Sequence, residues 1–149
     1  MNTTPTEVLL VEDSPHDVEL TLHTLKKNKL ANHIHVVRDG AEALDFLFCR
    51  NAYARRSPNH VPKVVMLDLK LPKVDGLEVL RQIRGDERTR SLPVVVMTSS
   101  REESDIIESY KLGINSYIVK PVEFEKFSEA VRLVGCYWLL MNEPPPPPL

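Results

Sequence analysis

The sequence predicts an α/β fold in which helices cover both faces of a five-stranded parallel sheet, a doubly wound arrangement. Five short apolar runs alternate along the chain with segments whose apolar residues recur every three or four positions. The runs are apolar throughout, which is typical of strands that are buried on both faces of a parallel sheet. With 149 residues, the chain has the length of one domain that can bury a core of its own.

The first two strand–helix units begin with the apolar runs Val8–Val11 and Ile34–Val37. Ser14 and Pro15 follow the first run and supply an N-cap and a first-turn proline, so we expect a helix to begin there. Asp39 and the glycine after it predict a turn and a cap in front of the second helix.

The other three units follow the same order. Their predicted strands are Val64–Leu67, residues 94–97 and residues 117–119. Asp75 predicts the start of the helix after the third strand, and Gly113 predicts the end of the helix after the fourth. The chain therefore repeats a strand–helix unit five times.

The last predicted helix starts near Glu123 and continues to Met141. One flank of this helix is expected to cover the sheet, and it carries Phe124, Phe127, Val131, Val134 and Trp138. A second flank carries Leu133, Tyr137 and Leu140, and we expect residues 137–140 to extend beyond the core. Because a monomer offers nothing to cover this flank, we expect a homodimer built on the last helix, the fifth strand and the helix before it.

The domain is assigned to residues 1–143, and residues 144–149 form a proline-rich C-terminal tail. Consecutive prolines cannot extend a helix or a sheet, since each lacks an N–H donor. The tail is expected to be loosely packed, or to be bound by a proline-reading partner. Its folding back over the apolar flank is the alternative to the homodimer.

The composition excludes several classes of function. Lys and Arg number 19 against 21 Asp and Glu, a formal net charge of −2, which argues against a nucleic-acid binder and a polybasic membrane-surface protein. No apolar run approaches the roughly 18 residues that a membrane span needs, and residues 1–6 lack the features of a secretory signal. Cys49 and Cys136 lie far apart without metal-site spacing, so we expect a cytoplasmic protein.

Five polar residues follow the predicted strands at their carboxyl ends. They are Glu12, Asp13, Asp68, Thr98 and Lys120. Because the carboxyl ends of parallel strands meet at one edge of the sheet, we expect these side chains to converge on one site. Each alone has a simpler interpretation, since acids and hydroxyls often cap helices and lysines are often solvated. Their equivalent positions favour a common site.

The predicted site has the groups that phosphoryl transfer to a carboxylate requires. Three close carboxylates repel one another, and oxygen ligands of this kind suit Mg²⁺. A carboxylate beside the ion can attack phosphorus and form an acyl phosphate, while Lys120 and Thr98 stabilise the phosphoryl oxygens. The sequence thus predicts a phospho-accepting aspartate.

Four motifs resemble the receiver domain of two-component response regulators over nearly the whole chain. They are VLLVEDS, VVMLDLKLPKVDGLEVL, VVVMTSS and NSYIVKP. The resemblance implies a flavodoxin-like (βα)5 receiver fold, with Asp68 as the phosphorylation site. It also implies Asp13 as a direct Mg²⁺ ligand, Glu12 as a ligand through water, and the Lys70 backbone carbonyl as a further ligand.

The same resemblance assigns Thr98 and Lys120 to the family's hydroxyl and lysine positions, and Tyr117 to the position of an aromatic switch residue. Three further segments, DVELTL, LFCRNAYARRSPNH and GCYWLLMNEPPP, are similar to stand-alone regulators associated with cyanobacterial and bacterial phytochromes. This similarity implies a phosphoryl group supplied by a sensor histidine kinase of the phytochrome type. Too few residues follow the fifth unit for a DNA-binding module, so we expect output through protein–protein contacts.

Two other functions fit parts of the pattern. A phosphatase of the haloacid dehalogenase type resembles it in using a strand-end aspartate and Mg²⁺, but needs a second acid where this chain has Lys70. A flavodoxin-like FMN carrier needs a hydroxyl-rich loop after the first strand, where this chain has Glu12 and Asp13. We therefore expect a phosphorylatable switch rather than an enzyme.

Overall fold

The five apolar runs form one parallel sheet in the computed structural model, which describes residues 6–146. The strand order is β2-β1-β3-β4-β5, so that β2 and β5 are the edges. The strands are β1 (Val8–Val11), β2 (Ile34–Val37), β3 (Val64–Leu67), β4 (Val94–Thr98) and β5 (Ser116–Val119). The three inner strands are buried along their whole length, whereas the two edge strands are partly exposed.

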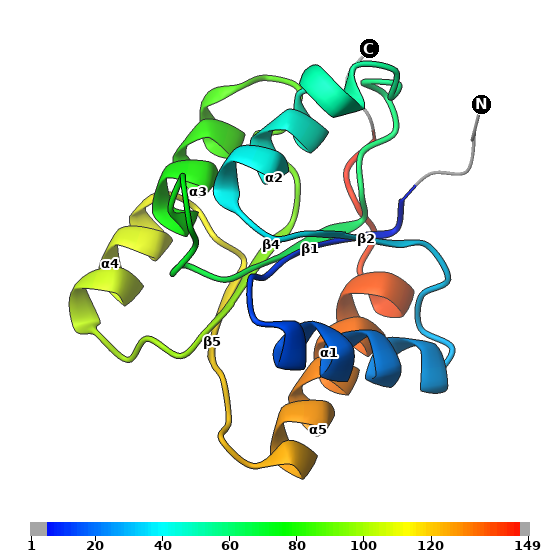
Figure 1. Ribbon diagram of the computed structural model, residues 1–149, viewed down its shortest axis with the longest axis vertical. Helices are drawn as coiled ribbons and strands as arrows, with labels where there is room; N and C mark the ends of the chain where they lie inside the picture. The colour runs from blue at the N-terminus through cyan, green and yellow to red at the C-terminus, as the bar shows by residue number, and fades with distance from the viewer. Residues whose placement is uncertain (1–5, 147–149) are drawn as a thin grey trace.

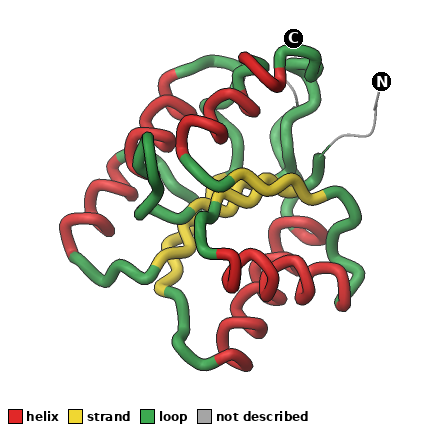
Figure 2. Tube along the Cα trace, viewed as in Figure 1, coloured by secondary structure: helices red, strands yellow, loops and turns green. Residues whose placement is uncertain are grey.

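Helices cover both faces of this sheet, as the sequence predicts. They are α1 (Pro15–Lys27), α2 (Gly40–Leu47), α3 (Gly76–Gly85), α4 (Glu103–Lys111) and α5 (Phe124–Gly135), and a short 3-10 helix spans Asn51–Tyr53. In Figure 1, α2, α3 and α4 lie on one side of the strands, and α1 and α5 lie on the other. Figure 2 shows the strands running between the two helical layers.

Each face of the sheet has its own apolar core, because successive strand residues point to opposite faces. Along β3, Val65 and Leu67 belong to the core under α2 and α3, whereas Val64 and Met66 belong to the core under α1 and α5. The doubly wound α/β fold predicted from the apolar runs is therefore confirmed.

The predicted caps form at the helix starts. The Ser14 side chain accepts a hydrogen bond from the Asp17 amide, the Asp39 side chain from the Glu42 amide, and the Asp75 side chain from the Glu78 amide. Each bond satisfies a donor that the first helical turn would otherwise leave unpaired. The predicted stop after α4 also forms, since Gly113 has a φ of +83°, which favours glycine.

The last helix departs from the prediction beyond Gly135, where α5 continues as a π-helical turn over Cys136–Met141. The segment reaches Met141 as expected, but the wider turn changes which side chains face the core. Leu139 is only 7% exposed and packs in the core, so the prediction that it lies beyond the core is wrong. Trp138 packs against the same core, which agrees with its predicted place on the flank that covers the sheet. Phe124 is a second correction, since it borders the groove between α1 and α5 and is 57% exposed.

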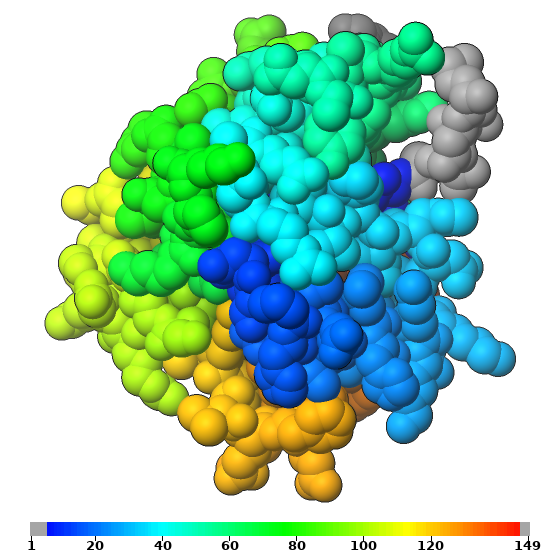
Figure 3. Space-filling model, viewed as in Figure 1, coloured from blue at the N-terminus to red at the C-terminus, as the bar shows by residue number. Residues whose placement is uncertain are grey.

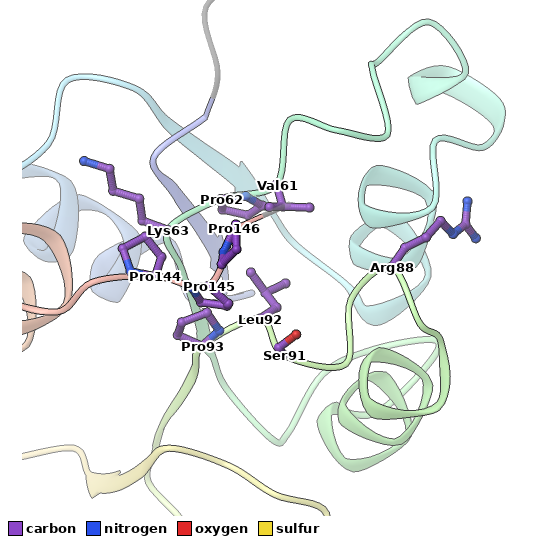
Figure 4. Close-up of a pocket in the computed structure, with 10 residues that line it drawn as sticks. All are labelled: Val61, Pro62, Lys63, Arg88, Ser91, Leu92, Pro93, Pro144, Pro145 and Pro146. Atoms are coloured by element: carbon purple, nitrogen blue, oxygen red, sulfur yellow. The ribbon is translucent and has the colours of Figure 1, made fainter. Parts of the chain in front are cut away.

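The second apolar flank of the last helix is exposed, as predicted. The side chains of this flank, Leu133, Tyr137 and Leu140, are 54%, 48% and 66% exposed. These fractions include any cover by tail residues 144–146, which the structure describes. Residues 144–146 instead line a hollow of about 150 Å³ at the edge where β3 and β4 begin; Val61, Pro62, Leu92 and Pro93 also line it (Figure 4). The alternative in which the tail covers this flank is wrong for these prolines, and residues 147–149 lie outside the described part of the chain.

Candidate functional site

The carboxylates of the predicted site meet at the carboxyl ends of β1 and β3. Val11 and Leu67 are paired in register, so the residues that follow them, Glu12 and Asp68, leave the sheet side by side. Glu12, Asp13 and Asp68 each offer an oxygen atom, and these atoms all lie within 4.8 Å of one another. Glu12 and Asp68 are buried, whereas Asp13 is exposed.

Lys120, which follows β5, is the cation at the centre of this cluster. Its Nζ atom lies 2.5 Å from Glu12 Oε1 and 2.9 Å from Asp68 Oδ2, and its side chain is 8% exposed. The same atom lies 2.9 Å from Asp17 Oδ2 on α1. Sequence reasoning missed Asp17, because an acid in the first turn of a helix is explained by the helix dipole alone.

The charges of the cluster change its titration. Burial raises the pKa of the Asp68 carboxyl, but the Lys120 ammonium, with a smaller contribution from the Thr98 hydroxyl, outweighs burial and holds that pKa below its usual value. Burial is also the largest influence on Glu12, and it raises the pKa of Glu12 to about 7 although Lys120 opposes it. Burial opposes the charge on Lys120, yet its hydrogen bonds to Glu12 and Asp17 raise the Lys120 pKa. Asp68 is therefore an ionised carboxylate at neutral pH.

The donor set fits a small divalent cation. Mg²⁺ prefers oxygen ligands and binds proteins through few carboxylates, which leaves positions for water and phosphoryl oxygens. Asp13 and Lys70 border the same open hollow, where the start of α1 meets the β3–α3 loop; Figure 3 shows these two segments in contact at the surface, in blue and green. The Lys70 amide donates a 3.3 Å hydrogen bond to Asp68 Oδ1, which holds the β3–α3 loop over the site.

Thr98 and Tyr117 both contact the loop between β4 and α4. Thr98 is fully buried, and its hydroxyl oxygen accepts a 3.4 Å hydrogen bond from the Ser100 amide. The Tyr117 hydroxyl donates a 3.1 Å hydrogen bond to the Ser100 carbonyl. The Thr98 hydroxyl is also a partner of the Asp68 carboxyl. The structure thus brings Thr98 next to Asp68, and it links Tyr117 to the site through Ser100.

A close approach of the backbone supports the position of Asp68. A Cβ atom on Gly76, the first residue of α3, would lie 2.4 Å from the carbonyl oxygen of Asp68 and 2.5 Å from the Cα of Leu69. Any larger residue would therefore displace either α3 or the β3–α3 loop.

The sequence model of the response regulator receiver domain matches residues 8–132. Rcp1, a response regulator of Synechocystis sp., is 38% identical over 135 residues, which cover 91% of this chain and 90% of Rcp1. A "Probable methanogenesis regulatory protein FilR2" of Methanothrix harundinacea is 40% identical over 143 residues, which cover 96% of this chain and 90% of that protein.

Solved structures of response regulators are also similar to this chain. The crystal structure of the Mn²⁺-bound form of Rcp1 has a TM-score of 0.88 and 35% identity, covering 95% of this chain and 99% of that one. The bacteriophytochrome response regulator RtBRR has a TM-score of 0.75 and 52% identity, covering 96% of this chain and 86% of that one.

These matches favour a receiver over a phosphatase of the haloacid dehalogenase type and over an FMN carrier. Receiver domains are signalling modules that take a phosphoryl group from histidine kinases, and the solved structure of one relative, Rcp1, is that of its Mn²⁺-bound form. Within the described part of the chain, no helix has both the length and the apolar character that a bilayer crossing requires. The chain belongs to the response regulator receiver domain family.

Proposed function

We propose that this receiver is a Mg²⁺-dependent switch that carries its phosphoryl group on Asp68. The observation that carries the proposal is the position of the Asp68 carboxylate, with Oδ2 2.9 Å from Lys120 Nζ and the other two acids within 4.8 Å. A carboxylate oxygen of Asp68 attacks the phosphorus of a phosphohistidine. A P–O bond forms while the P–N bond breaks, and the imidazole nitrogen leaves with the bonding electron pair.

The remaining residues have separate roles in this proposal. Asp13 directly, Glu12 through water and the Lys70 carbonyl would hold Mg²⁺, which supplies positive charge to the phosphoryl oxygens when bound. Lys120 neutralises a phosphoryl oxygen, and Thr98 donates a hydrogen bond to another. Because both Thr98 and Tyr117 contact Ser100, a movement of Thr98 toward the phosphoryl group draws the β4–α4 loop with it and shifts Tyr117.

The proposed phosphoryl donor is a sensor histidine kinase of the phytochrome type, acting in the cytoplasm. Two solved relatives support this partner by their own descriptions, the cyanobacterial phytochrome response regulator RcpA and the bacteriophytochrome response regulator RtBRR. Two exposed apolar residues, Val122 and Phe124, stand just after Lys120 and offer a docking surface beside the site.

The proposed output is a protein–protein contact that includes a homodimer. Leu133 of α5 begins an exposed apolar flank of the last helix, and Tyr137 and Leu140 continue this flank in the π turn. On α4, Ile107 and Tyr110 are also more than half exposed. Aromatic and aliphatic side chains gathered in this way favour an interface between proteins.

Intact-mass measurement after incubation with Mg²⁺ and acetyl phosphate tests the phosphoryl site. We expect one phosphoryl group on the wild type and none on Asp68→Asn, since the amide lacks the nucleophilic oxygen. Asp75→Asn is the matched control, because asparagine also caps a helix and Asp75 lies in the neighbouring loop. Labelling of Asp68→Asn at the wild-type level would contradict the assignment, and steady release of phosphate from aryl phosphates would favour the phosphatase.

A further inference from the structure

Asp105 connects the β3–α3 loop with the β4–α4 loop, beside the open hollow that Asp13 and Lys70 border. We call this hollow the mouth of the site. Asp105 lies in the first turn of α4, and its Oδ2 atom accepts a 2.6 Å hydrogen bond from the Ser100 hydroxyl. The same oxygen lies 3.4 Å from Nζ of Lys70, across the hollow that Asp13 also borders. The Asp105 side chain is 13% exposed. Its two contacts, to Lys70 and to Ser100, hold the β3–α3 loop against the β4–α4 loop.

Lys70 is the cation that connects Asp105 to the phosphorylation site. Its amide donates a hydrogen bond to Asp68 Oδ1, while its side chain is 64% exposed and its ammonium forms an ion pair with Asp105. Lys120, by comparison, is already surrounded by three carboxylates. Among the described residues at this mouth, Lys70 is thus the cation with the freedom to move toward a new anion.

We infer that Asp105 competes with a phosphoryl group on Asp68 for the ammonium of Lys70, an inference that rests on the proposed function. A phosphoryl group adds about −1.5 to −2 charges and attracts the ammonium more strongly than one carboxylate does. When Lys70 turns to the phosphoryl group, Asp105 keeps only the Ser100 hydroxyl. The Ser100 carbonyl accepts a hydrogen bond from Tyr117 of β5. The move of Lys70 from Asp105 to the phosphoryl group therefore loosens both the first turn of α4 and the contact between Ser100 and Tyr117.

Beryllofluoride, an analogue of a carboxylate-bound phosphoryl group, allows the competition to be measured at equilibrium. With Mg²⁺ at saturation, we expect Asp105→Asn to bind beryllofluoride about two- to fivefold more tightly than the wild type, the range set by one exposed ion pair. Glu103→Gln is the control, because it removes the same charge from the same helical turn at an exposed residue. The gain in beryllofluoride affinity for Glu103→Gln should be clearly smaller than that for Asp105→Asn.

The same measurement in a Lys70→Gln background separates competition from a general effect of charge. If Asp105 acts through Lys70, its substitution has no effect in that background. A gain for Asp105→Asn no larger than that for Glu103→Gln, or a gain that persists without Lys70, would overturn the inference. Wild-type binding that Asp68→Asn leaves unchanged would instead contradict the proposed function itself, so the two failures are distinguishable.

Discussion

The Nζ atom of Lys120 lies 2.9 Å from Oδ2 of Asp68, although the two residues are 52 positions apart in the chain. The same ammonium contacts Glu12 and Asp17, so one buried cation balances the acids that follow β1 and β3 and an acid of α1. Without a metal ion, the stability of this end of the sheet therefore depends on Lys120.

Replacement of Lys120 by Met should destabilise the metal-free protein by about 3 kcal/mol, because it leaves buried acids without a partner. Mg²⁺ should restore much of this loss, since the ion can take over the missing positive charge. Urea unfolding with and without Mg²⁺ measures both effects, and Lys126→Met is the control, as Lys126 is exposed on α5. Equal unfolding midpoints for the wild type and Lys120→Met in EDTA would contradict this role.

The stability of the metal-free protein should fall as the pH rises from about 4.5 to about 7. The Glu12 carboxyl has a pKa of 4.5 when unfolded and about 7 when folded, so the folded state binds more protons between these values. The loss should be about 3 kcal/mol and should level off above pH 7. Thermal unfolding in EDTA across this range should show a smaller slope for Glu12→Gln; an equal slope would assign the effect to another group.

Addition of Mg²⁺ should raise the melting temperature of the wild type, because the ion binds the folded site and not the unfolded chain. Asp13→Ala should lose most of this response, since Asp13 is the exposed member of the three acids and the one that borders the open hollow. A Glu19→Ala variant, which removes an exposed acid of α1, should respond like the wild type. Melting that is indifferent to millimolar Mg²⁺ in the wild type would exclude the metal site.

Replacement of Tyr53 by Phe should destabilise the protein by about 1 kcal/mol. The Tyr53 hydroxyl donates a 2.7 Å hydrogen bond to Glu42 and lies 2.9 Å from His35 Nε2, so it ties the segment before β3 to β2 and α2. Tyr110→Phe is the matched control, because Tyr110 is more than half exposed. Urea unfolding should separate the two variants, and equal midpoints would show that the Tyr53 hydroxyl contributes nothing.

A double variant, Tyr137→Glu with Leu140→Glu, should abolish the proposed homodimer by placing charges in its apolar surface. Light scattering at tens of micromolar should give the mass of a dimer for the wild type and of a monomer for the double variant. Asn59→Glu adds a charge at an exposed residue of the segment before β3, away from this surface, and should remain dimeric. A wild type that is monomeric with and without a phosphoryl group would refute the dimer.

Local signals were sufficient to predict most of the fold. The strands were visible because buried parallel strands are apolar at every position, and the caps at Ser14, Asp39 and Asp75 depend only on neighbouring residues. The convergence of Glu12, Asp68 and Lys120 followed from strand topology, which places the ends of parallel strands at one edge.

The features that sequence reasoning missed depend on contacts between distant segments. Asp17 and Asp105 each lie in the first turn of a helix, where an acid is ordinary, and only the folded chain brings them to Lys120 and Lys70. The burial of Leu139 escaped prediction because a regular helical period cannot anticipate a π turn. The course of the tail likewise depends on the hollow beneath β3 and β4.

The π turn also gives this protein a built-in optical reporter. Trp138 is the single tryptophan of the chain, and its ring centroid lies 4.9 Å from that of Tyr137. Indole emission therefore arises from the far end of the last helix alone, with Tyr137 as a neighbouring energy donor. A change in that emission when Asp68, at the opposite end of the sheet, receives a phosphoryl group would show that the signal reaches the last helix, without any added label.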